Sequence, residues 1–140
     1  MREVLDTSVL VAAIRSLTGA SGLRVEAVVA GDLKPLVPVP LVLEYESVLT
    51  RPEHLAGSAS AQANVDIVKA FCLMGEAVHI SHRLRPQLVD ADDEFVLEAA
   101  YHGRADTIVT INTRDFLKAA KRFGIAVLKP GEALERIRQQ

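Results

Sequence analysis

Four acidic residues, Asp6, Glu44, Asp93 and Asp115, lie far apart in the 140-residue chain, and each stands beside an apolar segment that can hold it rigidly. Carboxylates gathered in one site raise each other's pKa, and a hard divalent cation such as Mg²⁺ commonly offsets their repulsion. A cation held in this way beside a polyanion can activate water to hydrolyse a phosphodiester bond. We therefore expect the four acids to form a metal site and to act in catalysis, provided that the fold brings them together.

The first two acids also have ordinary structural explanations. Asp6, in VLDTSVL, could cap a helix, although the next two residues already offer capping hydroxyls. Glu44 could be an exposed acid near the positive end of a helix dipole. Its spacing from Leu41 nevertheless places it near the buried face of the expected helix, whereas Glu46 points to another side.

The other two acids lie at expected helix starts. Asp93 belongs to the run DADDE, in which Asp92 is the more natural cap and Asp93 is placed to reach a pocket. Asp115 follows the strand-like run DTIVTI and could lie in the first turn of the next helix, where a negative charge is favourable to the helix dipole. If that strand lies beside the first one, the hydroxyl of Thr110 and the amide of Asn112 could orient water molecules at the metal.

Short apolar runs alternate with helical patterns along the whole chain, which predicts a single domain over residues 1–140. The expected strands are 3–6, 35–39, 76–80, 106–111 and 125–129. The expected helices are 8–16, 23–31, 41–49, 60–75, 92–103, 113–124 and 131–139. The expected loops are 17–22, 50–60 and 81–91. Strands rich in Val, Ile and Leu are typical of a parallel sheet buried on both faces, so the fold class is α/β, a three-layer α/β/α sandwich with a central parallel sheet.

The amino-acid composition limits the kind of core, the possible disulfides and the expected location of the protein. The chain is 49% hydrophobic but only 4% aromatic, which indicates an aliphatic core and little capacity for stacking on bases. The lone cysteine, Cys72, is expected to be a buried apolar residue, and it excludes an intrachain disulfide. We expect a cytoplasmic protein, because MREVLD begins a strand without a leader-like segment and no apolar run reaches membrane-spanning length.

Several segments together resemble successive motifs of the PIN-domain nucleases. They are VLDTSVLVAA, LEYESVLTRP, DADDEFVLEAA, ADTIVTINTRDF and GIAVLKPGEAL, in this order. The resemblance covers essentially the whole chain and is closest to the single-domain bacterial toxins of toxin–antitoxin pairs. It implies a PIN fold and a metal-dependent endoribonuclease that uses Mg²⁺, or Mn²⁺ in its place.

The resemblance also implies roles for individual residues. It matches Asp6, Glu44, Asp93 and Asp115 to the four acids of the family and makes them the metal ligands and catalytic residues. It matches Ser8, Thr110 and Asn112 to supporting polar positions. Many members have an aspartate where this chain has Asn112, which leaves Asp115 alone to serve a second metal. Glu98 stands where the family is commonly small and apolar, so we expect it to face the surface.

Substrate and partners follow from the same resemblance. The expected substrate is single-stranded RNA, with Arg114 and Lys118 holding its backbone. These two belong to a C-terminal region, from residue 114 onward, that has seven Lys and Arg against three acids. A cognate antitoxin and a homodimer are the implied protein partners, with no membrane association.

Two other classes of protein remain as alternatives. A phosphotransfer domain would use Asp6 as phosphoacceptor, but a haloacid-dehalogenase-like enzyme needs an aspartate where this chain has Ser8. A receiver domain needs an acidic pair near the start and a late lysine, and neither is present in the expected place. A catalytically silent PIN module that only binds a partner is the second alternative, although four retained acids argue against it.

Overall fold

The computed structural model describes residues 2–55 and 60–138 and bears out the expected α/β class. All five expected strands are present but shorter than their apolar runs: β1 (Glu3–Leu5), β2 (Leu36–Val37), β3 (Glu76–Ala77), β4 (Thr107–Val109) and β5 (Ala126–Leu128). The α-helices of this part are α1 (Thr7–Arg15), α2 (Ala20–Val29), α3 (Val39–Leu49), α4 (Ala61–Met74), α5 (Glu94–His102), α6 (Leu117–Arg122) and α7 (Pro130–Arg138). Short 3₁₀ turns are η1 (Pro52–His54), η2 (Ala91–Asp93) and η3 (Thr113–Asp115).

All strand pairs in the described residues are parallel. One sheet has the order β1-β4-β5, and β2 pairs with β3 in a second, shorter ladder whose β2 contacts β1. In the first sheet Leu5 is in register with Val109, so the residues that follow, Asp6 and Thr110, leave adjacent strands at the same edge. The expectation that the strand around 106–111 lies beside the first one is confirmed.

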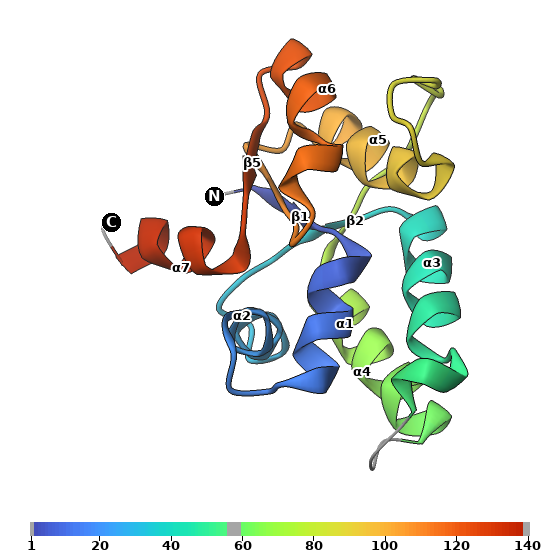
Figure 1. Cartoon of the computed structure of the whole chain (residues 1–140), viewed down its shortest axis with the longest axis vertical. Coiled ribbons are helices and arrows are strands. Elements are labelled where there is room, and N and C mark those ends of the chain that lie inside the picture. The colour runs from blue at the N-terminus through green and yellow to red at the C-terminus, as the bar shows by residue number, and fades with distance from the viewer. Residues whose placement is uncertain (1, 56–59, 139–140) are drawn as a thin grey trace.

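Helices cover both faces of the strands, as expected for a three-layer sandwich. In Figure 1, α5 and α6 lie on one side of the strands, and α1, α2, α4 and α7 lie on the other. Helix α5 packs on β1, β2 and β4, and α3 contacts both α1 and α5. Helix α3 therefore stands beside the sheet edge at which β1 ends.

Local sequence signals explain several helix boundaries. Ser60 caps α4 by accepting a hydrogen bond from the main-chain N–H of Ala63, and Pro40 lies within the first turn of α3. Gly31 and Gly124 have φ of 87° and 70° just after α2 and α6, a conformation that glycine adopts without strain.

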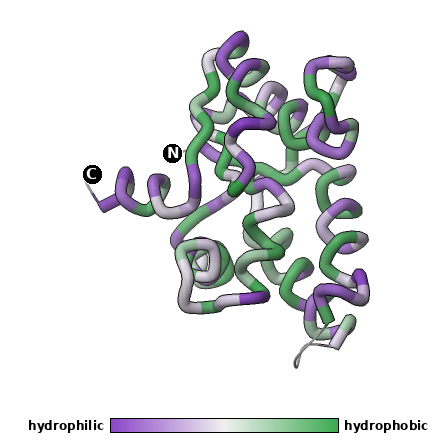
Figure 2. The backbone as a smooth tube through the Cα atoms, in the orientation of Figure 1, coloured by the Kyte–Doolittle hydropathy of each residue, from purple (hydrophilic) through white to green (hydrophobic). Residues whose placement is uncertain are grey.

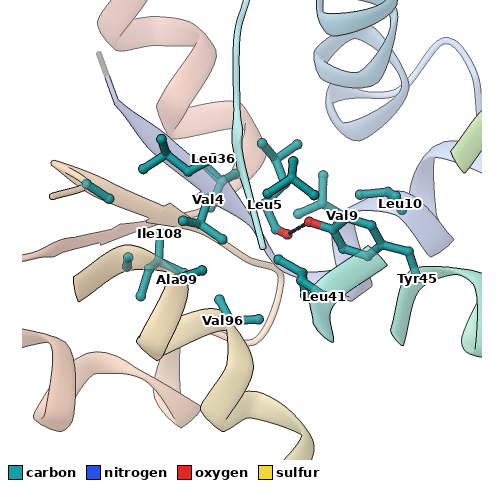
Figure 3. Close-up of a cluster of buried hydrophobic side chains, with 14 of the residues drawn as sticks. Val4, Leu5, Val9, Leu10, Leu36, Leu41, Tyr45, Val96, Ala99 and Ile108 are labelled. Atoms are coloured by element: carbon teal, nitrogen blue, oxygen red, sulfur yellow. Dashed lines mark hydrogen bonds between the residues drawn. The ribbon is translucent and has the colours of Figure 1, made fainter. Parts of the chain in front are cut away.

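The core is aliphatic and lies between the strands and the surrounding helices. Figure 2 shows the central strands as mostly hydrophobic, whereas the C-terminal helix is mostly hydrophilic. Tyr45 is a fully buried member of this core that carries a polar group. Its hydroxyl donates a 2.5 Å hydrogen bond to the carbonyl of Leu5, which joins α3 to the end of β1 (Figure 3).

Some local expectations were wrong. The expected loop 17–22 is shorter, because α2 begins at Ala20; a Cβ on Gly22 would lie 2.3 Å from the carbonyl oxygen of Leu17, so this glycine permits close packing inside a helix. Cys72 is half-buried rather than buried, and burial raises the pKa of its thiol to about 11. Residues 56–59 of the expected loop 50–60 lie outside the described part of the chain.

Candidate active site

Asp6 lies immediately after β1 and is 6% exposed. It is the N-cap residue of α1, but its carboxylate makes no capping hydrogen bond within the described residues. Its Oδ2 instead accepts hydrogen bonds from the hydroxyls of Ser8, at 2.6 Å, and Thr110, at 2.8 Å. Hydroxyls from the first turn of α1 and from the end of β4 therefore fix the orientation of this carboxylate, which a capping role does not require.

The turn after β4 completes this network. Thr110 is fully buried, and its hydroxyl accepts a hydrogen bond from the main-chain N–H of Asn112 at 3.0 Å. The N–H of Ile111 donates to the hydroxyl of Ser8 at 3.2 Å. The side chain of Asn112 is exposed and lines the same cavity as Asp6. The structure thus brings Ser8 and Thr110 to Asp6 directly and Asn112 to its neighbourhood.

Glu44 reaches the same cavity from α3. It is half-buried and lines a hollow of about 370 Å³ together with Asp6, Asp92 and Asp93, which we call the acid cavity. Glu46 lines a different hollow beside Lys69, on another side of the helix. The expected divergence of the two glutamates is therefore present in the structure.

The acidic turn at η2 supplies the third wall. Asp93 is half-buried, while Asp90 and Asp92 are exposed and also line the acid cavity. The cap of this turn is Asp90, whose carboxylate accepts a hydrogen bond from the N–H of Asp92 at 2.9 Å. The prediction that Asp92 is the cap was wrong. A 3₁₀ turn that begins at Ala91 precedes the helix, so the capping position moves to Asp90.

Asp115 lies in a neighbouring hollow rather than in the acid cavity. This second hollow, of about 530 Å³, also contains Asp93, Arg114, Lys118 and Arg122, and we call it the basic cavity. Asp90 and Asp93 line both cavities. The structure thus gathers Asp6, Glu44 and Asp93 around one hollow and joins Asp115, Arg114 and Lys118 to it through Asp93.

The acids of the two cavities act on each other electrostatically. Burial, followed by the negative charges of Asp6, Asp90, Asp115 and Asp92, raises the pKa of Asp93 from 3.8 to about 7. Burial and the charge of Asp92 are likewise the main causes that raise the pKa of Glu44, and Arg51 only partly counteracts them. This excess negative charge is what a cation would offset.

The donor set fits a hard cation, although the side chains do not converge in their present orientations. Within residues 2–55 and 60–138, no three His, Cys, Asp or Glu side chains form a group that could hold a metal ion. The available donors are carboxylate oxygens, which Mg²⁺ and Mn²⁺ prefer. Both hydroxyl bonds of Asp6 go to Oδ2, and Oδ1 accepts no hydrogen bond from the described residues. A metal site would require the carboxylates of Glu44 and Asp93 to turn toward Asp6 across the acid cavity.

Two buried glutamates of α5 shape this site without lining it. Glu98 is 1% exposed and accepts hydrogen bonds from the N–H of Leu84 and the side chain of Arg85. Glu94 is 2% exposed and accepts from the N–H groups of Gln87 and Leu88, so both anchor the loop that leads to Asp90. The expectation that Glu98 faces the surface was wrong, because unpaired main-chain donors of the loop require a buried acceptor. Their spacing of four residues, on one helix face, was the available signal.

Sequence reasoning also missed two basic residues of the acid cavity. Arg15, at the end of α1, and Arg51, just after α3, line it with the carboxylates. Neither arginine stands in a basic run of the sequence. The available signal was that each lies at or just after the end of a helix that carries or follows one of the site acids, Glu44 or Asp6.

Comparison with known proteins gives one match. The family model described as PIN domain matches residues 2–114, which is most of the chain. No curated protein and no solved structure matches the chain.

Proposed function

The chain belongs to the PIN domain family, and on that premise we propose that it is an endoribonuclease that cleaves single-stranded RNA with the help of Mg²⁺ or Mn²⁺. PIN domains are typically nucleases and generally use divalent metal ions. The observation that carries the proposal is the acid cavity, in which Asp6, Glu44 and Asp93 arrive from three separate elements around one hollow. The raised pKa of Glu44 and of Asp93 supports a role that a bound cation completes.

Asp6, Glu44 and Asp93 are the residues that would hold the metal. A bound divalent cation would supply an activated water and offset negative charge on the scissile phosphate. Asp6 is preorganised for this role, because the hydroxyls of Ser8 and Thr110 both bind its Oδ2 and neither occupies Oδ1. Asp115, beside Asp93 in the basic cavity, is placed to accept a proton from water or to serve a second ion.

Arg114 and Lys118 supply the binding of the RNA backbone in this proposal. Both are exposed and line the basic cavity next to Asp93 and Asp115. Fixed positive charges beside the carboxylates attract a phosphate and hold it near the catalytic groups. Asn112, exposed at the rim of the acid cavity, is a hydrogen-bond partner for the substrate or its water.

The biological setting belongs to the same proposal. We propose a cytoplasmic toxin that pairs with a cognate antitoxin and forms a homodimer. Exposed apolar side chains on α3 and α4, among them Leu43 at 62% and Leu73 at 83% exposure, support a protein-binding surface there. Among the described helices none is long and apolar enough to cross a membrane. The family assignment favours a nuclease over a phosphotransfer domain, and the silent binding module is the alternative that experiment must separate.

The test is cleavage of a labelled single-stranded RNA by the purified chain, with Mg²⁺, with Mn²⁺ and with EDTA. We expect metal-dependent cleavage, lost in Asp6→Asn and Asp93→Asn and retained in Asp32→Asn, a matched change of an exposed acid outside both cavities. Electron paramagnetic resonance of Mn²⁺ gives a second readout, since the two site variants should bind it more weakly. Full activity in either site variant overturns the proposal, and Mn²⁺ binding without cleavage identifies a silent module.

For the setting, growth arrest on expression of the wild type but not of Asp6→Asn tests the toxin role. Light scattering of the purified chain tests the homodimer, and a monomer at micromolar concentration contradicts it.

A further inference from the structure

Two guanidinium groups line the acid cavity beside its carboxylates. Arg15 and Arg51 are exposed and line the hollow that five acids also line: Asp6, Glu44, Asp90, Asp92 and Asp93. Within the part of the chain that the structure describes, neither arginine makes an ion pair. Their hydrogen-bond donors therefore remain available to a ligand that carries negative charge.

One of these arginines is held in place by a neighbouring ring. The Nη2 of Arg15 lies 3.1 Å from Nδ1 of His54, at the end of η1. Because arginine only donates hydrogen bonds, this Nδ1 is the acceptor and the ring proton is on Nε2. His54 thus orients Arg15 through a hydrogen bond, and the other donors of the guanidinium are left for another partner.

The segment that carries Arg51 and His54 is itself fastened to the core. Asn64, fully buried on α4, donates from Nδ2 to the carbonyl of Leu49 at 2.9 Å and to that of His54 at 3.5 Å. These two carbonyls belong to the last residue of α3 and the last residue of η1, so they enclose the segment that contains Arg51. A buried side chain therefore fixes the backbone from which Arg51 projects into the acid cavity.

Ordinary structural roles do not account for both arginines. Arg15 is favourable at the C-terminus of α1, where the helix dipole attracts a cation, but this does not explain Arg51. Arg51 lines the acid cavity with Glu44 but forms no ion pair with it in the described part of the chain.

We propose that Arg15 and Arg51, the flanking arginine pair, form a second phosphate-binding subsite for single-stranded RNA. This inference rests on the proposed function and extends it. The subsite lies in the acid cavity, whereas Arg114 and Lys118 lie in the basic cavity, and Asp93 lies between the two groups. Arg15 is on α1 and Lys118 is on α6. In Figure 1 these two helices lie on different sides of the β-strands. The two groups of basic residues would thus hold the RNA on both sides of the carboxylates.

The position of Arg15 determines which phosphate it holds. The Cα of Arg15 lies nine residues after that of Asp6, about 14 Å along α1 at 1.5 Å per residue, and both side chains line the acid cavity. The guanidinium is thus held to one side of Asp6, where it can contact a phosphate next to the scissile one. The flanking arginine pair therefore recognises RNA of several nucleotides, and its contribution should grow with the length of the substrate.

The experiment compares a 12-nucleotide RNA with a dinucleotide for the wild type, Arg15→Gln, Arg51→Gln and the double variant. Arg136→Gln, an exposed arginine on α7 outside both cavities, is the matched control. We expect each single variant to raise the KM of the 12-mer about fivefold to tenfold with little change in kcat, and to raise that of the dinucleotide less than twofold. The salt dependence of 12-mer binding, measured by anisotropy in EDTA, should lose about one unit of log–log slope per arginine removed.

The outcomes separate the two proposals. If the wild type binds and cleaves RNA but the arginine variants match Arg136→Gln, or weaken both substrates equally, the subsite is refuted and the nuclease stands. If the wild type neither binds nor cleaves any RNA, both proposals fail. Arg51→Lys, which keeps the charge and loses the planar fork, should fall between the wild type and Arg51→Gln, and circular dichroism verifies that each variant is folded.

Discussion

The hydroxyl of Tyr45 donates a 2.5 Å hydrogen bond to the main-chain carbonyl of Leu5 in the centre of the core. These two residues are the immediate neighbours of Glu44 and Asp6. One buried bond therefore sets the position of α3, which carries Glu44, against the end of β1, which leads to Asp6 (Figure 3). Burial raises the pKa of the Tyr45 phenol well above its ordinary range, so the hydroxyl remains a donor at every relevant pH.

Tyr45→Phe removes this bond without changing the packed ring. The carbonyl of Leu5 then loses a buried partner, and we expect a loss of about 1–2 kcal/mol in the free energy of unfolding. We also expect a severalfold fall in kcat, because Glu44 is no longer held in register with Asp6. Urea unfolding and RNA cleavage measure the two effects, with Tyr101→Phe on the exposed side of α5 as control. Wild-type values for both contradict the assigned role.

Thr110→Val removes the buried hydroxyl that holds Asp6 Oδ2. Residues that orient a metal ligand commonly contribute 10–100-fold to metal affinity or activity, and we expect a loss of about that size. Thr110→Ser should retain most of the metal affinity and activity, because serine keeps the hydroxyl and loses only the methyl group. Mn²⁺ affinity and cleavage rate are the measurements; equal activity of the Val and Ser variants is inconsistent with an orienting role.

Asp93 should make the metal-free protein less stable as pH rises. The pKa of Asp93 is about 7 in the folded chain, against an ordinary value of 3.8. The folded state therefore holds this proton more tightly, so the stabilisation is complete below about pH 4 and is lost as the pH rises toward 7. Allowing for solvent screening, we expect Asp93→Asn to be about 1–2 kcal/mol more stable than the wild type at pH 8 and to lack this loss.

Thermal unfolding in EDTA between pH 4 and pH 8 measures this difference. Added Mg²⁺ should raise the Tm of the wild type at pH 8 and leave that of Asp93→Asn nearly unchanged, because a cation replaces the proton only where the carboxylate is present. Identical pH profiles for the two proteins argue against a strained Asp93.

Glu3 and Arg24 form an ion pair buried between β1 and α2, in which two nitrogen atoms of the guanidinium bond to the two carboxylate oxygens. Glu3→Gln leaves a buried positive charge without its counter-ion, which should cost about 3–5 kcal/mol. Replacing both, as Glu3→Leu with Arg24→Met, should cost much less because no unpaired charge remains. Urea midpoints compare them, and additive losses in the double variant contradict a coupled pair.

The order and type of the elements were predictable from sequence, and so was the parallel sheet. Short apolar runs at 3–6, 35–39, 106–111 and 125–129 each contain a strand, and the structure shortens each strand within its run. The run at 76–80 also contains a strand, but β3 covers only Glu76–Ala77 and is not buried. Asp6 and Thr110 could be expected to meet, because each follows a strand and the strands are parallel.

Other features of the site depend on side-chain contacts between segments far apart in sequence. Glu98 looks like an exposed helix acid until the loop around Leu84 and Arg85 packs over it. The placement of Asp115 in the basic cavity and of Arg15 and Arg51 in the acid cavity likewise depends on how helices cross.

The amino-acid sequence by itself determined the layers, the order of the strands and the polar residues that follow β1 and β4, because these follow from local periodicity and from the edge that parallel strands share. Only the tertiary structure decided which charges face each other, which glutamates are buried as loop anchors and which arginines line the acid cavity beside the carboxylates. The physical reason is that burial and electrostatic coupling depend on distances through space, and the chain sets these distances only when all its helices have packed.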